Sequence, residues 1–376
     1  MACGLYIHVP FCRTRCHYCA FYLRIYREDL AQAFVSALLK EMHLHAAAQT
    51  SRGLSWGSVY FGGGTPTMLP ARELIRLLDA VRSHFPVASD AEITVEGAPD
   101  SLTAEDLCAL RTAGFNRLSL GMETSVPDEL LAIGRRGLSD PVVDSVQAAR
   151  RAGFDNINLD LIYGLPGQTE NSWRRSLDEA LALAPSHLSI YALSVEAGSR
   201  FHVDAHRGDL PELNEALTLR MEGFTAEHLT EAGFERYEIS NYARPGFSCR
   251  HNRLYWEAGE YLGLGPSAQS YVGGRRFGIV ADLDQYIERL GMDTLPLCDE
   301  QQLPPEQQAR EALVFGLRLL AGVDTQSPAA TTAMPSLHPA LAQLQSDRLL
   351  EFVGTRIRLT ELGRRFADTV AVELLT

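Results

Sequence analysis

The sequence predicts an α/β protein in which helices cover a mostly parallel sheet, followed by a smaller, mostly helical domain. From residue 5 to about 193, short β-branched runs alternate with amphipathic helical stretches, the pattern of repeated βα units. After residue 200 the alternation stops, and the last part of the chain has the pattern of a helix, a short hairpin and a helix. That pattern resembles a winged-helix module, and a length of 376 residues fits about two domains.

Six strands are predicted in the first part, at 5–9, 57–63, 92–97, 117–123, 156–164 and 187–193. These runs are nearly apolar throughout, as expected of a parallel sheet covered on both faces. The helix after the first strand is predicted from Leu30, Phe34, Leu38 and Met42, which recur every four residues on one face. Periodicity does not decide between an open sheet and an incomplete barrel. In both, functional side chains are expected at the carboxyl ends of the strands.

The second part of the chain is expected to begin with a long helix at about 212–232 and to continue through a Gly-rich segment at 261–274. The sequence LPPEQQ near residue 303 is a predicted linker, because consecutive prolines discourage a continuous helix. We therefore predict three parts, at 1–235, 236–302 and 303–376.

Charge and cysteine content exclude several classes of protein. A net charge of −13 argues against broad nucleic-acid binding, in spite of the winged-helix-like tail. The sequence has no apolar run of about 18 residues for a membrane span, and its start lacks the pattern of a secretory signal. The seven cysteines are unevenly spread, unlike a secreted disulfide framework. We expect a cytoplasmic protein with no nucleic-acid partner and no stable membrane insertion.

Three cysteines, Cys12, Cys16 and Cys19, follow the first predicted strand with the spacing Cys-x3-Cys-x2-Cys. Structural zinc sites usually have four protein ligands, and His17 could complete such a site only with awkward geometry. A [4Fe–4S] cluster has four irons, so three thiolates would leave one iron open to an external chelator. The spacing therefore favours an iron–sulfur cluster over zinc.

Other polar groups are expected near this loop, at the carboxyl ends of later strands. The Gly-rich turn FGGGTPT (61–67) follows the second strand and would let a ligand approach the backbone. Glu96 ends the third strand, Glu123 ends the fourth and Asp160 lies in the fifth, where carboxylates can accept from an amine or from ribose hydroxyls. Arg135 is available for a carboxylate. Together these groups predict one shared ligand.

The cysteine loop, with Tyr18 before Cys19, resembles that of the radical S-adenosylmethionine (SAM) superfamily. The segments YIHVPFC, FGGGTPT, NLDLIYGLPGQ and YEISNYARPG…HNRLYW resemble the HemN/HemW group of that superfamily over nearly the whole chain. The resemblance implies a partial (β/α)6 barrel of the TIM type, a [4Fe–4S] cluster on the three cysteines, and SAM bound to the open iron by its amino and carboxylate groups. Ten residues fall on SAM-contacting positions: Tyr6, Tyr18, Gly63, Gly64, Thr65, Glu96, Glu123, Arg135, Asp160 and Ala192.

The chain departs from the group's pattern at two positions. Glu123 stands where the group usually has Gln, so this side chain can accept from a ribose hydroxyl but cannot donate as an amide does. Gly97 stands where the group has a larger residue.

Two activities occur in the group. HemN, the oxygen-independent coproporphyrinogen III oxidase, carries a further Cys where this chain has Phe21, and a long segment before its first strand. The sequence HNRLYW (251–256) instead matches the His-Asn-x-x-Tyr-Trp heme-binding motif of the HemW branch. There the resemblance implies an iron ligand in His251, with Cys249 as an open alternative. Tyr255 and Trp256 would offer flat apolar surface, and Arg250 and Arg253 would meet propionates.

The expected function is therefore that of a heme chaperone that binds heme and transfers it to an acceptor protein. The alternative is a radical SAM enzyme that acts on a tetrapyrrole. Expected partners are heme, an unidentified acceptor and a low-potential electron donor, and a homodimer stays open. Cleavage of SAM to methionine and a 5′-deoxyadenosyl radical would need an electron on the cluster, and the resemblance does not decide whether transfer of heme uses that reaction.

Overall fold

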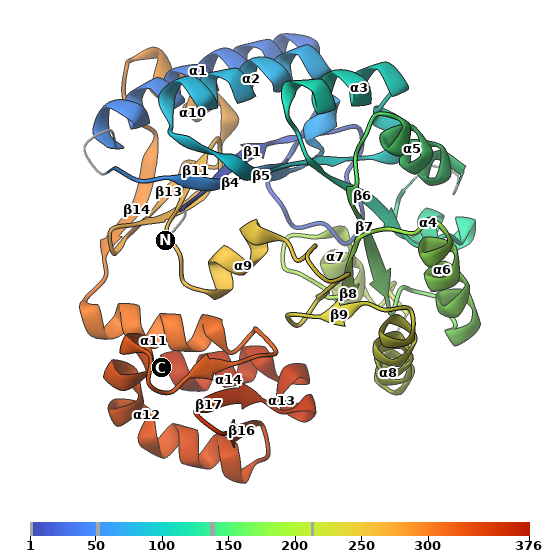
Figure 1. Cartoon of the computed structure of the whole chain (residues 1–376). Helices are drawn as coiled ribbons and strands as arrows, with labels where there is room; N and C mark the ends of the chain where they lie inside the picture. The colour runs from blue at the N-terminus through green and yellow to red at the C-terminus, as the bar shows by residue number, and fades with distance from the viewer. Residues whose placement is uncertain (1–2, 50–52, 136–139, 212–213) are drawn as a thin grey trace.

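The computed structural model describes residues 3–49, 53–135, 140–211 and 214–376. A curved sheet with helices on its outer face forms the larger part of the molecule, and a small domain made mostly of helices lies below it (Figure 1). The α/β class and the mostly helical C-terminal domain predicted from the sequence are confirmed.

Six consecutive parallel strands form the centre of a twelve-stranded sheet. They correspond to the six predicted strands, and the sheet curves into an incomplete barrel (Figure 1). In order across the sheet they are β1 (Cys3–Val9), β4 (Trp56–Gly63), β5 (Val87–Gly97), β6 (Arg117–Glu123), β7 (Asn156–Tyr163) and β8 (His187–Ala192).

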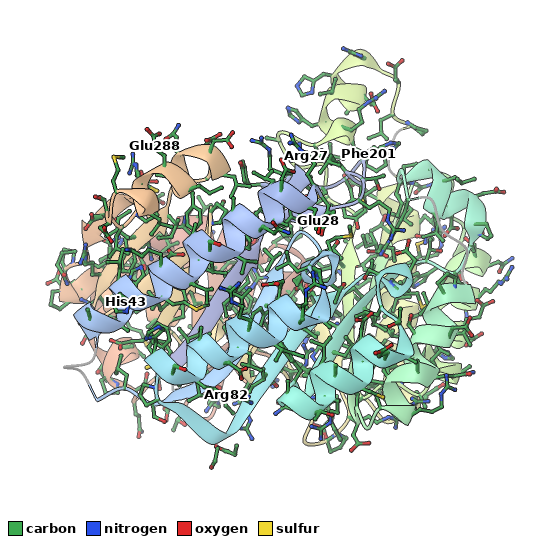
Figure 2. All side chains as sticks on the ribbon, turned by 90° about the horizontal axis from the view of Figure 1, so that it is seen from above. Arg27, Glu28, His43, Arg82, Phe201 and Glu288 are labelled. Carbon is green, nitrogen blue, oxygen red and sulfur yellow. The ribbon has the colours of Figure 1, made fainter. Side chains whose placement is uncertain are left out.

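The helices that follow these strands cover the outer face of the sheet. In α2, one face carries Leu74, Leu77, Leu78 and Val81, all buried, which is the spacing of an amphipathic helix. Figure 2 shows α1 and α2 side by side above the sheet. The helices of this part are α1 (Glu28–Gln49), α2 (Ala71–His84), α3 (Ala104–Ala113), α4 (Pro127–Ala132), α5 (Asp140–Arg151), α6 (Glu170–Ala182), α7 (Arg200–Arg207) and α8 (Glu215–Glu231). Residues 212 and 213, where the long helix was predicted to begin, lie outside the described residues.

The inner face of the barrel is polar, which differs from the nearly apolar strands that we predicted. Leu5, Ile7 and Val9 of β1 are fully buried in the apolar core under the helices. The residues between them alternate to the other face, because successive side chains of a strand point to opposite sides. The same alternation gives a polar inner row: Tyr6, His8, Ser58, Tyr60, Thr94, Glu96, Arg117, Ser119, Asn158, Asp160, His187 and Ser189. Hydrogen bonds join many of these, so the barrel encloses a polar interior rather than an apolar core.

Further strands extend both edges of the barrel sheet. On one edge β11 (Tyr261–Leu264) is parallel to β1, and β12 (Gln269–Val272), β13 (Arg275–Ile279) and β14 (Leu297–Gln302) continue antiparallel. On the other edge lie β10 (Asn241–Ala243) and β9 (Glu235–Arg236), both antiparallel. The same segment contributes the helices α9 (Arg250–Trp256) and α10 (Leu283–Gly291).

The C-terminal part has its own apolar core, which includes Leu313, Leu337, Leu341 and Ile357. Its three-stranded sheet and four helices include the predicted helix, hairpin and helix. The elements are α11 (Pro305–Gly316), β15 (Val323–Asp324), α12 (Pro328–Ser346), β16 (Leu350–Val353), β17 (Arg356–Leu359), α13 (Glu361–Arg365) and α14 (Ala367–Leu375). The boundaries at 235 and 302 stay a prediction. Among the described residues, no helix is both long enough and apolar enough to cross a bilayer.

A buried carboxyl group joins α1 to α10 and should make stability depend on pH. Glu41 is fully buried, and its Oε2 accepts from the Tyr286 hydroxyl (2.6 Å) and the Gly265 amide (2.8 Å). Burial raises the pKa of Glu41 to about 7. His45 Nε2 lies 3.9 Å from Oε1, and burial lowers the pKa of His45 to about 4, so this imidazole gives little compensation near pH 7.

We therefore expect protonated Glu41 to contribute up to about 3 kcal/mol to the free energy of unfolding below pH 4.5. This contribution is lost as the pH rises through 7. The variant Glu41→Gln keeps the acceptor oxygen but does not titrate. Its melting temperature relative to wild type should therefore rise between pH 5 and pH 8. A difference that stays constant over this range would contradict the assignment.

Candidate functional site

The three cysteines lie on one closed loop at the carboxyl end of β1. The short strands β2 (Phe11–Cys12) and β3 (Arg24–Ile25) pair and close the loop, and the Tyr26 amide donates to the Cys12 carbonyl (3.0 Å). Cys12, Cys16 and Cys19 are half-buried free thiols. Burial raises the pKa of the Cys12 and Cys16 thiols, while the positive charge of Arg135 acts in the opposite direction on both.

The Gly-rich turn after β4 lies directly against this loop. The Gly64 amide donates to the Val9 carbonyl (2.9 Å) and the Thr65 amide to the Phe11 carbonyl (2.7 Å). A Cβ atom on Gly64 would lie 2.6 Å from the Phe11 carbonyl oxygen and 3.0 Å from Cys12 Sγ, so only glycine permits this approach. Gly63, before it, has a φ of 113°.

This donor set fits an iron–sulfur cluster. Three thiols share one loop, and the glycine turn packs against that loop close to the sulfur of Cys12. Within the described ranges, no three His, Cys, Asp or Glu side chains converge on a single metal ion. A [4Fe–4S] cluster needs no such convergence, because each cysteine binds a different iron.

Replacing Gly64 by alanine should prevent cluster assembly, because the added methyl group would collide with the cysteine loop. We expect Gly64→Ala to keep little of the iron and sulfide that wild type holds after anaerobic reconstitution. Gly223→Ala is the matched control, since a Cβ atom at Gly223 meets nothing within 4 Å. Equal iron content in Gly64→Ala and wild type would contradict the close approach.

Of the acidic groups, Glu96 and Glu123 lie at the carboxyl ends of β5 and β6, and Asp160 lies in the middle of β7. Glu96 Oε1 accepts from the Tyr60 hydroxyl (2.6 Å), and burial raises the pKa of Glu96 to about 7. Asp160 accepts from Ser119 (3.3 Å) and Asn158 (2.8 Å), and burial raises its pKa as well. Ala192, the last residue of β8, is exposed at the same end. This end of the barrel therefore has several acceptors for amine or hydroxyl donors.

Glu123 and Arg135 form an ion pair beside the cysteine loop. The carboxylate is 9% exposed and the guanidinium 21% exposed. The Tyr18 hydroxyl donates to Glu123 Oε1 (3.2 Å), which connects the pair to the loop. On the other side, the Tyr6 hydroxyl makes a hydrogen bond of 3.1 Å with His8 Nδ1. Phe21, two residues after Cys19, is 65% exposed.

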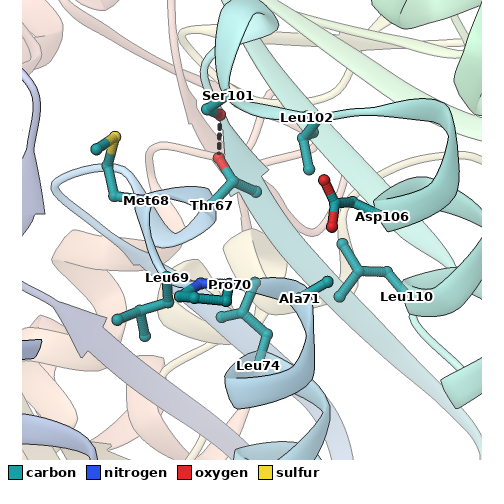
Figure 3. Close-up of a pocket in the computed structure, with 10 residues that line it drawn as sticks. All are labelled: Thr67, Met68, Leu69, Pro70, Ala71, Leu74, Ser101, Leu102, Asp106 and Leu110. Carbon is teal, nitrogen blue, oxygen red and sulfur yellow. Dashed lines mark hydrogen bonds between the residues drawn. The ribbon is translucent and has the colours of Figure 1, made fainter. Parts of the chain in front are cut away.

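A cavity of about 190 Å³ lies behind the glycine turn, between the short 3-10 helix Pro66–Met68 and α3 (Figure 3). The hydroxyls of Thr67 and Ser101 are 2.6 Å apart at its edge. A Cβ atom on Gly97 would lie 3.0 Å from Thr67 Oγ1, so the small residue permits this packing. We assign no ligand to this cavity.

The HNRLYW segment forms α9, which lies at the opposite end of the barrel from the cysteine loop. It leads directly into β11, whose first residues pair with the start of β1, and the Gly4 amide donates to the Glu260 carbonyl (3.0 Å). His251 makes a hydrogen bond of 2.9 Å with Ser58, near the start of β4. The expectation that functional groups gather at the carboxyl ends therefore fails for this motif, which lies at the amino ends.

His251 is buried inside the barrel and both of its nitrogens are engaged. Nδ1 bonds to Ser58, and Nε2 lies 2.8 Å from the Tyr255 hydroxyl. The imidazole stacks on Tyr60 and Tyr6, with ring centroids 5.1 and 6.3 Å apart. Burial, together with the positive charge of Arg117, lowers the pKa of His251 to about 3, so the ring is neutral.

The neighbouring residues that we expected to contact heme also bind other groups of the protein. Cys249 is fully buried, donates to Glu92 Oε1 (3.3 Å), and has a pKa raised by burial to about 12. Arg250 pairs with Asp90 (3.2 Å), and Arg253 pairs with Glu257, which follows the last residue of α9. The two arginines that we expected at propionates thus have acidic partners already.

The other face of α9 lines a cavity of about 220 Å³ between the edge strands and α11. Five aromatic side chains line it, and Arg276, Gln308 and Glu311 supply polar groups. The sequence identified two of the lining residues and missed the rest, although aromatic residues at 261 and 271 lie within the Gly-rich segment. Six side chains give its shape: Tyr255, Trp256, Tyr261, Tyr271, Ala312 and Phe315.

Comparisons with known proteins agree with this architecture. The model of the radical SAM superfamily matches residues 6–180, and that of the HemN C-terminal domain matches residues 303–366. The heme chaperone HemW of Mycobacterium tuberculosis (strain H37Rv) is 37% identical over 375 residues, covering 99% of this chain and 94% of the relative. The heme chaperone HemW of Bacillus subtilis (strain 168) is 35% identical over 372 residues, covering 97% of each.

Among solved structures, the radical SAM enzyme HemN, a coproporphyrinogen III oxidase from Escherichia coli, is similar to the whole chain. The TM-score is 0.85 at 26% identity, with 100% of this chain and 90% of that chain covered. The likeness therefore includes both the incomplete barrel and the helical C-terminal domain.

Proposed function

The chain belongs to the HemW family of the radical SAM superfamily, and from this premise we propose that it is a heme chaperone that binds heme and passes it to an acceptor protein. The observation that carries the proposal is the position of α9 at the amino ends of the barrel strands. The cysteine loop lies at their carboxyl ends.

The separation of the two ends favours a carrier over an enzyme that transforms heme. Ser58, which holds His251, and Gly63, which lies beside the cysteine loop, are five residues apart in β4. At about 3.3 Å per residue this is roughly 16 Å of strand, and the polar interior of the barrel lies between the two ends. A heme at the α9 cavity would therefore lie at the end of the barrel away from the cysteine loop.

The cofactor end would hold a [4Fe–4S] cluster on Cys12, Cys16 and Cys19, with SAM on the open iron. When bound, the cluster and SAM supply one-electron reductive chemistry. Glu96 and Asp160 would accept from the amino group and the ribose hydroxyls of SAM, as their acceptor oxygens suggest. The remaining residues proposed around SAM are Tyr6, Tyr18, Gly63, Gly64, Thr65, Glu123, Arg135 and Ala192.

At the other end, Tyr255 and Trp256 would hold one edge of the porphyrin in the aromatic cavity. The volume of about 220 Å³ is below that of a typical small-molecule pocket, about 300–1,000 Å³, so the rest of the ring would extend outward. His251 supports Tyr255 through the 2.8 Å hydrogen bond. For His251 to bind iron, Nε2 would have to give up its hydrogen bond to the Tyr255 hydroxyl.

The proposal includes an acceptor protein for heme, a low-potential electron donor for the cluster and a location in the cytoplasm. Seven free cysteines in the described chain are consistent with a reducing compartment. A homodimer stays open as the assembly in which heme is passed on.

Titration of the anaerobically reconstituted protein with hemin, followed by its Soret band, tests the proposal. We expect saturation at one heme per chain. A band that does not saturate, or no specific band, would contradict the function as a heme carrier.

A further inference from the structure

We propose that Glu123 controls SAM binding, because it holds Arg135 in an internal ion pair that the carboxylate of SAM has to displace. The inference rests on the proposed function in one respect, that SAM binds at the cysteine loop. It assigns to Glu123 a role opposite to that of a simple ligand contact: the residue would weaken the binding of SAM.

The ion pair lies within the site and is partly shielded from water. Glu123 and Arg135 are 9% and 21% exposed, so their attraction is screened less than that of a surface pair. The Tyr18 hydroxyl gives Glu123 a further donor at 3.2 Å.

The backbone is shaped to bring Glu123 to this position. Its φ is 55°, a left-handed conformation that residues other than glycine seldom adopt, and the register between β6 and β7 shifts between Gly121 and Glu123. A shift of this kind re-aims a side chain at the end of a strand. A Cβ atom on Gly121 would lie 2.8 Å from Glu123 Oε1 and 3.0 Å from Arg135 Nη1, so the chain leaves room for the pair.

Arg135 is held in place by its backbone. Its amide donates to the Leu130 carbonyl (2.8 Å), and the His17 amide of the cysteine loop donates to the Ile133 carbonyl (2.8 Å). The backbone of Arg135 is therefore fixed beside the loop, and two carboxylates, those of Glu123 and SAM, would compete for its guanidinium. A glutamine at 123 would remove one competitor and leave Arg135 free for bidentate binding of the other.

The test is the dissociation constant of SAM, measured by equilibrium dialysis of labelled SAM against reconstituted protein with equal cluster content. We expect Glu123→Gln to bind SAM on the order of tenfold more tightly than wild type. Asp128→Asn removes the same charge from an exposed position of α4 and should leave the affinity unchanged. Equal or weaker binding by Glu123→Gln would overturn the inference.

A double-mutant cycle separates competition from a change in folding. Arg135→Gln should weaken SAM binding more in the Glu123→Gln background than in wild type, because only there is Arg135 free before SAM binds. Additive effects would overturn the inference. If no variant with a full cluster binds SAM, the proposed SAM site at the cysteine loop fails as well, whereas equal affinities overturn only the role of Glu123.

Discussion

Replacing Cys16 by alanine abolishes the iron–sulfur cluster if the three loop cysteines are its only protein ligands. The remaining thiols of Cys12 and Cys19 would leave two irons without a protein ligand. We expect iron and sulfide to fall to background after anaerobic reconstitution, and SAM binding to be lost with them. Cys108→Ala, at an exposed cysteine outside the loop, should keep the full cluster.

The same variant tests the separation of the two ends of the barrel. Because α9 lies at the amino ends of the strands, Cys16→Ala should still bind heme with the affinity of wild type. A variant that keeps wild-type iron would contradict the ligand assignment. A variant that loses heme together with the cluster would contradict two separate sites.

Filling the aromatic cavity should cause a large loss of heme affinity. Ala312 of α11 lines the cavity opposite α9, and a tryptophan there would occupy the space proposed for the porphyrin edge. The tryptophan and the porphyrin edge would compete for the same space, and a loss of about 1.4–2.8 kcal/mol of binding free energy would lower heme affinity about 10- to 100-fold. Soret titration measures this loss.

Ala216→Trp is the control for the cavity variant, since Ala216 is exposed on α8. Iron content and melting temperature should be close to wild type in both variants. Unchanged heme affinity in Ala312→Trp would exclude this cavity as the heme site.

The six barrel strands and the cysteine loop could be predicted from the sequence because both are local patterns. Strand periodicity and cysteine spacing depend on neighbours a few residues away. The polar inner face was missed although the sequence contains its signal, since Asn156, Asn158 and Asp160 alternate with apolar residues. Arg117, fully buried within the barrel, is an extreme case of a charged residue in a strand described as apolar.

The position of α9 could not be predicted, because it depends on pairing between distant segments. The parallel contact of β11 with β1 joins residues some 250 positions apart, and no local pattern specifies it. The same pairing turns His251 inward to Ser58 and leaves Tyr255 and Trp256 to line the cavity. The motif was found from its residues, while its location at the amino ends required the fold.

For the Glu123–Arg135 pair, the sequence identified the residues and the fold was needed to show their contact. The sequence identified Glu123 as a departure and Arg135 as a ligand for a carboxylate, but not that the two would pair. Their contact depends on the register shift at the end of β6 and on the packing of the cysteine loop.

The central claim, that heme is carried and not consumed, is tested most directly by mass spectrometry of the heme after incubation. Reconstituted protein would be incubated anaerobically with heme, SAM and a low-potential reductant, and 5′-deoxyadenosine would be measured in the same samples. The account predicts heme recovered with unchanged mass, whatever amount of 5′-deoxyadenosine forms. An altered porphyrin that forms in proportion to 5′-deoxyadenosine would contradict it and establish an enzyme that acts on tetrapyrroles.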